Sequence, residues 1–297
     1  APYGVAVQRR ACSQDQDCGD GRSCDGTYCR TAAGEAFADT WVTHLIQADS
    51  PIASNLNFRG YVVRVESDRM SVDAGSFINV GLGATSNVAA GKHWVYFTGR
   101  FVDSTTYPYP VMLRFTRRDP PPSAAWASAS LETTYAAEDA RGVAVSSDET
   151  RLYLLTHVPD TLLVVRLSGS LGGFPATQII RTVPLPYLAN ELVVIPRPGR
   201  GDLLAISCTG SNVLAIYDED LGALAAQVTS VGEQPFGITY DLRGDGARLY
   251  VSDFGDGRVA VVDIPDLDRP QEARTVAHLG DQQLCLTQIT ATATGTQ

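Results

Sequence analysis

Two histidines and an aspartate occupy equivalent positions in a repeated strand, and their side chains could ligate a metal or transfer a proton. Each of His44, His157 and Asp253 directly follows a hydroxyl residue that ends a short apolar strand. Gly99 and Cys208 occupy the same position in two further copies of the strand. If the copies lie side by side, these five residues form one column on one face of the protein.

The longest loops predicted on this face are residues 45–60 and 100–110. The second loop contains Tyr107 and Tyr109, each followed by a proline, which presents the aromatic rings at low entropic cost. We predict that this face and these two tyrosines contact a ligand or a partner. The structural alternative is that polar residues at strand ends only satisfy backbone groups of turns. The two histidines also lie two repeats apart, so geometry decides between the alternatives.

The column is positioned by five copies of one strand, each ending in a hydroxyl residue. The copies are Trp41-Val42-Thr43-His44, Tyr96-Phe97-Thr98-Gly99, Leu154-Leu155-Thr156-His157, Ala205-Ile206-Ser207-Cys208 and Tyr250-Val251-Ser252-Asp253. Steps of 45 to 58 residues separate the hydroxyl residues. Strand-like units with a period of about 50 residues predict an all-β fold, a β-propeller of four-stranded blades. Five blades are recognisable in residues 1–297.

The fifth copy shows the blade pattern best, with strands predicted at 235–240, 248–253, 259–263 and 272–279. Residues 2–7 parallel residues 235–240, so the chain is expected to begin on the first strand of a blade. Residues 284–287 fall where a sixth blade would start. We therefore expect that the ring does not close in isolation, and that further sequence or a partner chain supplies the remaining strands, because open sheet edges favour strand addition.

Leu249-Tyr250-Val251-Ser252-Asp253, followed by a Gly257 turn and the strand 259–263, resembles the YVTN family of β-propeller repeats. The resemblance weakens toward the N-terminus and covers about three fifths of the chain. It implies a propeller fold. The family includes surface-layer proteins, binding proteins and lactonase-like enzymes, so the resemblance leaves function open.

Four of the six cysteines, Cys12, Cys18, Cys24 and Cys29, lie in a polar segment rich in Asp and Gly. Such a segment cannot form an apolar core, which favours disulfides over the alternative of a zinc knuckle, whose cysteines usually come in closer pairs. Three pairings are open to four cysteines. Residues 12–29 resemble small disulfide modules of secreted myxobacterial proteins, and that resemblance implies the alternating pairing Cys12–Cys24 with Cys18–Cys29. It also implies an exported location. Because residues 2–7 parallel residues 235–240, we expect residues 12–29 to be an insertion between the first two strands of the first blade.

The two remaining cysteines, Cys208 and Cys285, are predicted to form a third disulfide, because leftover cysteines of an exported protein more often pair than stay free. This bridge would attach the last predicted strand to the fourth blade.

Composition narrows the classes of partner. The net charge of −10, from 33 acidic and 23 basic residues, disfavours nucleic acid and anionic membranes. No apolar stretch approaches the roughly 18 residues of a membrane span. No metalloprotease, nucleophile-elbow, haem-attachment or phosphate-loop motif occurs in the sequence.

These observations predict an exported, non-catalytic propeller, without a cofactor, that binds or scaffolds a protein or cell-surface partner. The alternative is a lactonase- or lyase-like enzyme with its site at the channel mouth. That enzyme would require at least two of His44, His157 and Asp253 to converge with acidic residues around a metal ion.

Overall fold

The computed structural model describes residues 2–9, 12–18, 21–35, 37–47, 58–66, 77–79, 83–91, 94–101, 112–117, 128–132, 138–171 and 174–280. The chain divides into two compact units. The first unit comprises residues 1–145 and 167–177, and the second comprises residues 146–166 and 178–297.

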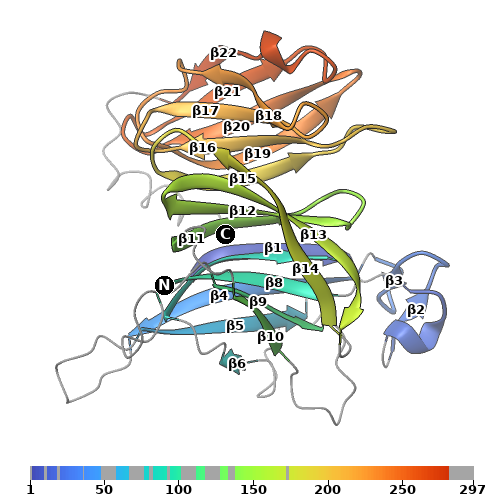
Figure 1. The fold of residues 1–297 in the computed structure, drawn as a ribbon. Helices are drawn as coiled ribbons and strands as arrows, with labels where there is room; N and C mark the ends of the chain where they lie inside the picture. Colours follow the sequence, from blue (N-terminus) through green and yellow to red (C-terminus); the bar gives the residue numbers. More distant parts are fainter. Residues whose placement is uncertain are drawn as a thin grey trace. The chain divides into compact units, whose positions relative to one another are not determined.

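The described strands form five four-stranded antiparallel sheets, or blades (Figure 1). Blade 1 has the order β1-β4-β5-β6, from Pro2–Arg9, Ala38–Gln47, Phe58–Glu66 and Phe77–Asn79. Blade 2 has the order β10-β9-β8-β7, from Ser128–Glu132, Met112–Arg117, Trp94–Phe101 and Gly83–Ala90. Blade 3 has the order β11-β12-β13-β14, from Glu138–Val145, Arg151–Val158, Asp160–Leu171 and Phe174–Pro184.

Blade 4 has the order β15-β16-β17-β18, from Ala189–Ile195, Leu203–Cys208, Val213–Asp218 and Ala223–Val228. Blade 5 has the order β19-β20-β21-β22, from Pro235–Arg243, Gly246–Asp253, Arg258–Ile264 and Arg274–Leu279. A short 3-10 helix, Pro270–Glu272, precedes the last strand. The fold is therefore all-β, with the four-stranded blades of a propeller, and the predicted fold class is confirmed.

Blades 4 and 5 pack face to face, because their strands alternate apolar side chains toward a shared core. From blade 4 the core receives Leu203, Ala205, Leu214 and Ile216, and from blade 5 it receives Leu249, Val251, Ala260 and Val262. β16 and β17 are buried along their whole length, whereas most of the last strand, β22, is exposed. Figure 1 shows these two blades as adjacent twisted sheets at the C-terminal end of the colour scale.

At two of the five copies, the repeated hydroxyl residue links one blade to the next. Thr98 of blade 2 donates its Oγ1 hydrogen to the carbonyl of Arg141 in β11, with the two oxygens 2.5 Å apart. Ser207 of blade 4 makes the equivalent bond to the carbonyl of Phe236 in β19, at 2.6 Å. In both cases the acceptor directly precedes a glycine of the next first strand. At these two copies the hydroxyl residue has a structural role between blades, whereas Thr156 and Ser252 bond within their own blades.

The segment between β1 and β4 contains two disulfides, Cys12–Cys24 and Cys18–Cys29, with Cα atoms 5.9 and 5.5 Å apart. This is the alternating pairing that the resemblance to secreted modules implied. The segment forms a 3-10 helix, Asp15–Cys18, and a two-stranded sheet of β2 (Ser23–Cys24) and β3 (Cys29–Arg30). Its small core contains Cys18, Cys29 and Phe37, and the guanidinium of Arg22 lies 3.8 Å from the centre of the Phe37 ring.

Among the described residues, no helix is long and apolar enough to cross a membrane.

Candidate functional site

The described residues include only part of the predicted column. His44 lies in β4, but the description does not extend to its side chain. Tyr107, Tyr109 and Cys285 lie outside the described residues. The predictions that rest on them stay predictions.

His157 has a structural role at the junction of blades 3 and 4. Its Nε2 lies 2.9 Å from the carbonyl oxygen of Ala189, at the start of β15, and the residue is only 9% exposed. Three residues further, Asp160 accepts hydrogen bonds from the amides of Leu188 and Ala189. The turn at the end of β12 therefore fixes the start of the next blade. This arrangement matches the structural alternative for strand-end polar residues.

Cys208 is buried at the end of β16 and forms no disulfide with a cysteine of the described residues. Burial raises the pKa of its thiol to about 12, and the charge of Asp160 acts in the same direction. A thiol with this pKa is a poor nucleophile at neutral pH. Because Cys285 lies outside the described residues, the predicted bridge between the two stays a prediction.

Asp253 belongs to a pair of carboxyl groups at the end of β20. Its side chain is buried, with 2% of the residue exposed, and its Oδ1 accepts a hydrogen bond of 3.0 Å from the amide of Asp256. Its Oδ2 packs against Gly232, whose φ of +91° and missing Cβ allow this approach. Within the described residues, Oδ2 makes no hydrogen bond of ordinary geometry, although the nearby amide of Glu233 acts to lower the pKa of the carboxyl. A buried, unpartnered carboxyl oxygen is unusual in a folded protein and is a reason to look for function.

The two carboxyl groups titrate in opposite directions. Burial raises the pKa of Asp253 above its usual range, and the neighbouring charge of Asp256 adds to this effect. A hydrogen bond from Arg258 lowers the pKa of Asp256, and the carboxyl of Asp253 has the same effect on it. The Arg258 Nη2 atom lies 2.6 Å from Asp256 Oδ2. Such a pair can hold one proton on Asp253 while Asp256 stays ionised, which suits general acid–base chemistry.

This pair lies beside a pocket of about 390 Å³ on blade 5. Asp253 and Arg258 both line it, together with apolar groups of Phe254, Val259 and Leu279. We use "aspartate pocket" for this cavity. The sequence identified Asp253 but interpreted Asp256 only as part of a turn and did not single out Arg258. Their spacing of three and five residues after Asp253, across a tight turn, is the signal that could have identified them.

The described residues do not bring His157 and Asp253 into a metal site. In the described part of the chain, only Cys12, Cys18 and Cys29 place three candidate ligand atoms within 4.8 Å of one another. All three sulfurs are in disulfides, which excludes them as thiolate ligands. The zinc alternative for residues 12–29 is therefore excluded, and the described residues hold no other cluster of three candidate ligand atoms.

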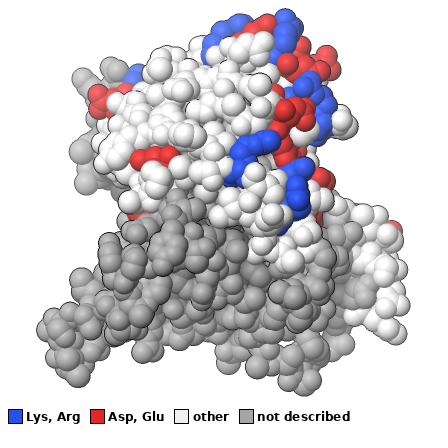
Figure 2. All heavy atoms as spheres, in the orientation of Figure 1, with Lys and Arg blue, Asp and Glu red and all other residues white. Residues whose placement is uncertain are grey.

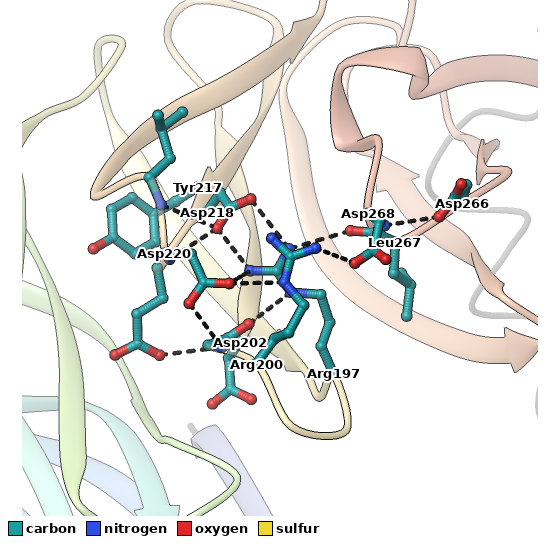
Figure 3. Close-up of polar contacts among 12 residues, drawn as sticks. Arg197, Arg200, Asp202, Tyr217, Asp218, Asp220, Asp266, Leu267 and Asp268 are labelled. Carbon is teal, nitrogen blue, oxygen red and sulfur yellow. Dashed lines mark hydrogen bonds and ion pairs between the residues drawn. The ribbon is translucent and has the colours of Figure 1, made fainter.

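In blades 4 and 5, the strand ends opposite to the aspartate pocket contain a network of ion pairs (Figures 2 and 3). Arg197 is 4% exposed and forms two hydrogen bonds with the carboxylate of Asp218, of 3.1 and 2.7 Å. Its Nη1 also donates to the carbonyl of Leu267 in blade 5, at 3.3 Å. Arg200 pairs with Asp220 and with Asp268. Figure 2 shows acidic and basic side chains side by side along one edge of the described surface.

Comparison with known proteins finds similar solved structures but no matching family model or curated sequence. The YVTN resemblance and the disulfide-module resemblance therefore stay predictions at the level of family.

Solved structures do match. A candidate 6-phosphogluconolactonase from Bacteroides uniformis has a TM-score of 0.58 and 11% identity, over 85% of this chain and 70% of its own. The periplasmic gluconolactonase of Pseudomonas aeruginosa has a TM-score of 0.53 and 16% identity, over 82% and 70%. A protein of unknown function from Desulfotomaculum acetoxidans has a TM-score of 0.55 and 17% identity. The match covers 74% of this chain and 62% of that protein.

At these identities the likeness establishes the fold. Lactonases recur among the neighbours, which favours the lactonase-like alternative over the predicted non-catalytic binding module. The prediction of a non-catalytic protein was wrong. It depended on the absence of known motifs, and general acid–base chemistry by a carboxyl pair needs no linear motif.

Proposed function

We propose that the protein is a lactonase-like hydrolase that opens the ring of a small sugar-type lactone in the aspartate pocket. The observation on which this depends is the carboxyl pair Asp253–Asp256, with opposed pKa shifts, next to Arg258. The lactonases among the neighbours of the same fold support the choice of reaction.

Hydrolysis of a lactone requires one group that accepts a proton, one that donates a proton, and one that stabilises negative charge. In the proposed mechanism, ionised Asp256 removes a proton from water as the water oxygen attacks the lactone carbonyl carbon. The guanidinium of Arg258 stabilises the oxyanion. The bond from that carbon to the ring oxygen then breaks, and protonated Asp253 gives its proton to the ring oxygen. Proton transfer from Asp256 to Asp253 restores the starting state, and the product is a hydroxy acid.

We also propose an exported location. The two disulfides of residues 12–29 support it, because disulfides of this kind persist in oxidising compartments. One neighbour of the same fold is named as a periplasmic enzyme. Secretion assays with the unprocessed gene product would test the proposal, and a reduced cytoplasmic protein would contradict it.

The proposed activity is tested by titrating the acid released from glucono-δ-lactone, with a panel of five- and six-membered lactones as further substrates. We expect Asp253→Asn and Asp256→Asn each to lower kcat by about 10²- to 10⁴-fold, the usual contribution of a positioned acid or base. Asp241→Asn is the matched control, because Asp241 lies at the far end of β19 in the same blade, 61% exposed in its side chain.

Two results would contradict different parts of the proposal. If the wild-type protein hydrolyses no lactone of the panel faster than the double variant D253N/D256N, the proposed reaction is wrong. If the wild type is active and D253N keeps full activity, the reaction stands and the assigned site is wrong.

A further inference from the structure

A second depression, of about 800 Å³, lies at the opposite ends of the strands, between the sheets of blades 3 and 4 within the second unit. Five arginines line it: Arg151, Arg166, Arg181, Arg197 and Arg200. The chain has 23 basic and 33 acidic residues, for a net charge of −10. The concentration of five arginines in one depression therefore requires a physical explanation.

Three of these arginines come from adjacent strands. Arg151 in β12 and Arg166 in β13 are direct partners in the antiparallel register. Arg181 lies in β14, the next strand of the sheet. The three are spaced fifteen residues apart in sequence, as expected for successive hairpins of equal length. Like charges directly opposite each other on neighbouring strands destabilise a sheet. The row therefore costs folding free energy unless negative charge compensates it.

Some of these arginines have a carboxylate partner in the described structure and others do not. Arg151 pairs with Glu219, with Nε 2.8 Å from Oε1. Arg181 donates to the hydroxyl of Tyr217 at 2.8 Å and to the backbone carbonyl of Glu219 at 3.3 Å, and neither acceptor is charged. Arg166 is exposed, and within the described residues it has no hydrogen bond or ion pair.

The carboxylates nearby are already engaged elsewhere. Asp202 accepts hydrogen bonds from the amide and the hydroxyl of Ser147, at 2.8 and 2.6 Å. Asp220 pairs with Arg197 and Arg200. Glu219 also accepts a hydrogen bond of 2.7 Å from Tyr153, whose own pKa burial raises. Asp148 lies 3.7 Å from Arg151 and accepts hydrogen bonds from the hydroxyls of Ser146 and Thr150. The carboxylates of the described lining are thus all engaged with groups other than Arg166 and Arg181.

We propose that this depression, the "arginine groove", is a binding site for a phosphate group, with Arg166 and Arg181 as its main ligands. Two guanidinium groups match the two negative charges of a phosphate, and their planar N–H donors fit its oxygens in pairs. Ile180 and Pro198 line the same depression and could contact the organic part of a phosphorylated small molecule. The groove lies at the opposite strand ends from the aspartate pocket, so this site does not depend on the proposed hydrolase activity.

The test is calorimetric titration of the whole protein with inorganic phosphate and with glucose 6-phosphate, at constant ionic strength. We expect saturable binding to the wild type, and about tenfold weaker binding to Arg166→Gln and to Arg181→Gln, the loss of one hydrogen bond between charged groups. Tighter binding of glucose 6-phosphate than of phosphate would support a phosphorylated metabolite as ligand; equal binding would support phosphate itself. Arg243→Gln is the control, because Arg243 is also exposed but lies in blade 5 beside Asp241.

A second measurement separates binding from general screening. Without phosphate, R166Q should melt at a higher temperature than the wild type, because one repulsion is removed. With saturating phosphate, the order should reverse. The proposal is overturned if sodium chloride of equal ionic strength gives the same stabilisation as phosphate, or if R243Q weakens binding as much as R166Q. If R166Q does not fold, Arg166→Lys keeps the charge but loses the paired donors, and unchanged phosphate affinity in R166K would also overturn it.

Discussion

The buried charged groups at the two ends of the strands in blades 4 and 5 differ in how completely they are paired. At one end, which we call the arginine rim (residues 196–202, 218–222 and 265–269), buried Arg197 faces buried Asp218 in a two-point contact. At the other end, the aspartate rim (residues 209–212, 229–234 and 253–258), Asp253 is buried with one oxygen lacking a partner in the described structure.

Under the proposed function, this difference separates an end built for stability from an end built for chemistry. A paired buried charge is held in one ionisation state and connects the turns around it. A buried carboxyl with an incomplete set of partners keeps a displaced pKa, which costs stability and is typical of functional sites. The arginine rim connects blade 4 to blade 5 through the carbonyl of Leu267, whereas the aspartate rim holds the one described carboxyl pair with opposed shifts beside a pocket.

The largest effect should come from breaking the pair at the arginine rim. Arg197→Met leaves Asp218 buried, at 7% exposure, without its cation. We expect a loss of about 3–5 kcal/mol in the free energy of unfolding, measured by urea denaturation. The double variant R197M/D218L should recover part of the loss, because no unpaired charge remains. Arg200→Gln is the control, since Arg200 is exposed and should change stability little. A loss below about 1 kcal/mol in R197M would mean that the rim is not a structural tie.

A backbone change at the aspartate rim should have the next largest effect. A Cβ at position 232 would overlap Asp253 Oδ2, and the φ of +91° is unfavourable for alanine. We expect Gly232→Ala to cost about 1–3 kcal/mol, the usual range for a strained backbone residue, and to displace the carboxyl. Gly244→Ala is the matched control, because its φ is +58° but nothing lies within 4 Å of the added atom. Equal losses in both variants would show that backbone strain alone, and not contact with Asp253, restricts position 232.

Two of the repeated hydroxyl residues, next to the aspartate rim, allow a paired comparison with a smaller expected effect on stability. Ser207 is fully buried and donates to Phe236 of the next blade, whereas Ser252 is exposed and bonds only to Gly237 of its own blade. We expect Ser207→Ala to cost about 1–2 kcal/mol because the Phe236 carbonyl loses its partner. Ser252→Ala should leave stability nearly unchanged. Thermal unfolding of the two variants measures the difference, and a larger loss in S252A would refute the inter-blade role of this position.

The sequence was sufficient to predict this framework. Strands 248–253 and 259–263 were predicted within two residues of β20 and β21, because central strands are short apolar runs between turn residues. The fourth strand of blade 5 was predicted at 272–279 but begins at Arg274, after a 3-10 helix that ends at Glu272. The residues of this strand are mostly exposed and give a weaker alternation than the core strands, which explains the shift.

The site was harder to predict than the framework. The position after the hydroxyl singled out Asp253, the acid of the proposed mechanism, but it equally singled out His157, whose ring contacts the carbonyl of Ala189. That contact depends on where the next blade begins, which is not a local property of the sequence. Asp256 and Arg258 were missed because Asp-Gly sequences are typical of turns for reasons unrelated to function. The arginine row was visible in principle, since Arg151, Arg166 and Arg181 lie at equal spacing on three successive strands.

The smallest change in stability, and the most specific, should come from the charge of Asp253. The pKa of Asp253 is raised in the folded protein, so the folded state binds the proton more tightly than the unfolded state does. The stability associated with this group is therefore complete below its unfolded pKa near 3.8 and is lost as the pH rises through the folded pKa. Asp253→Asn keeps an acceptor for the amide of Asp256 but cannot ionise, so its stability should not fall over this range. Melting temperatures of wild type and D253N from pH 3 to pH 7 should thus diverge as the pH rises, with D253N the more stable at pH 7. If D253N is instead less stable at pH 7 and equal at pH 3, the charge of Asp253 stabilises the fold, and the contrast between the two rims is lost.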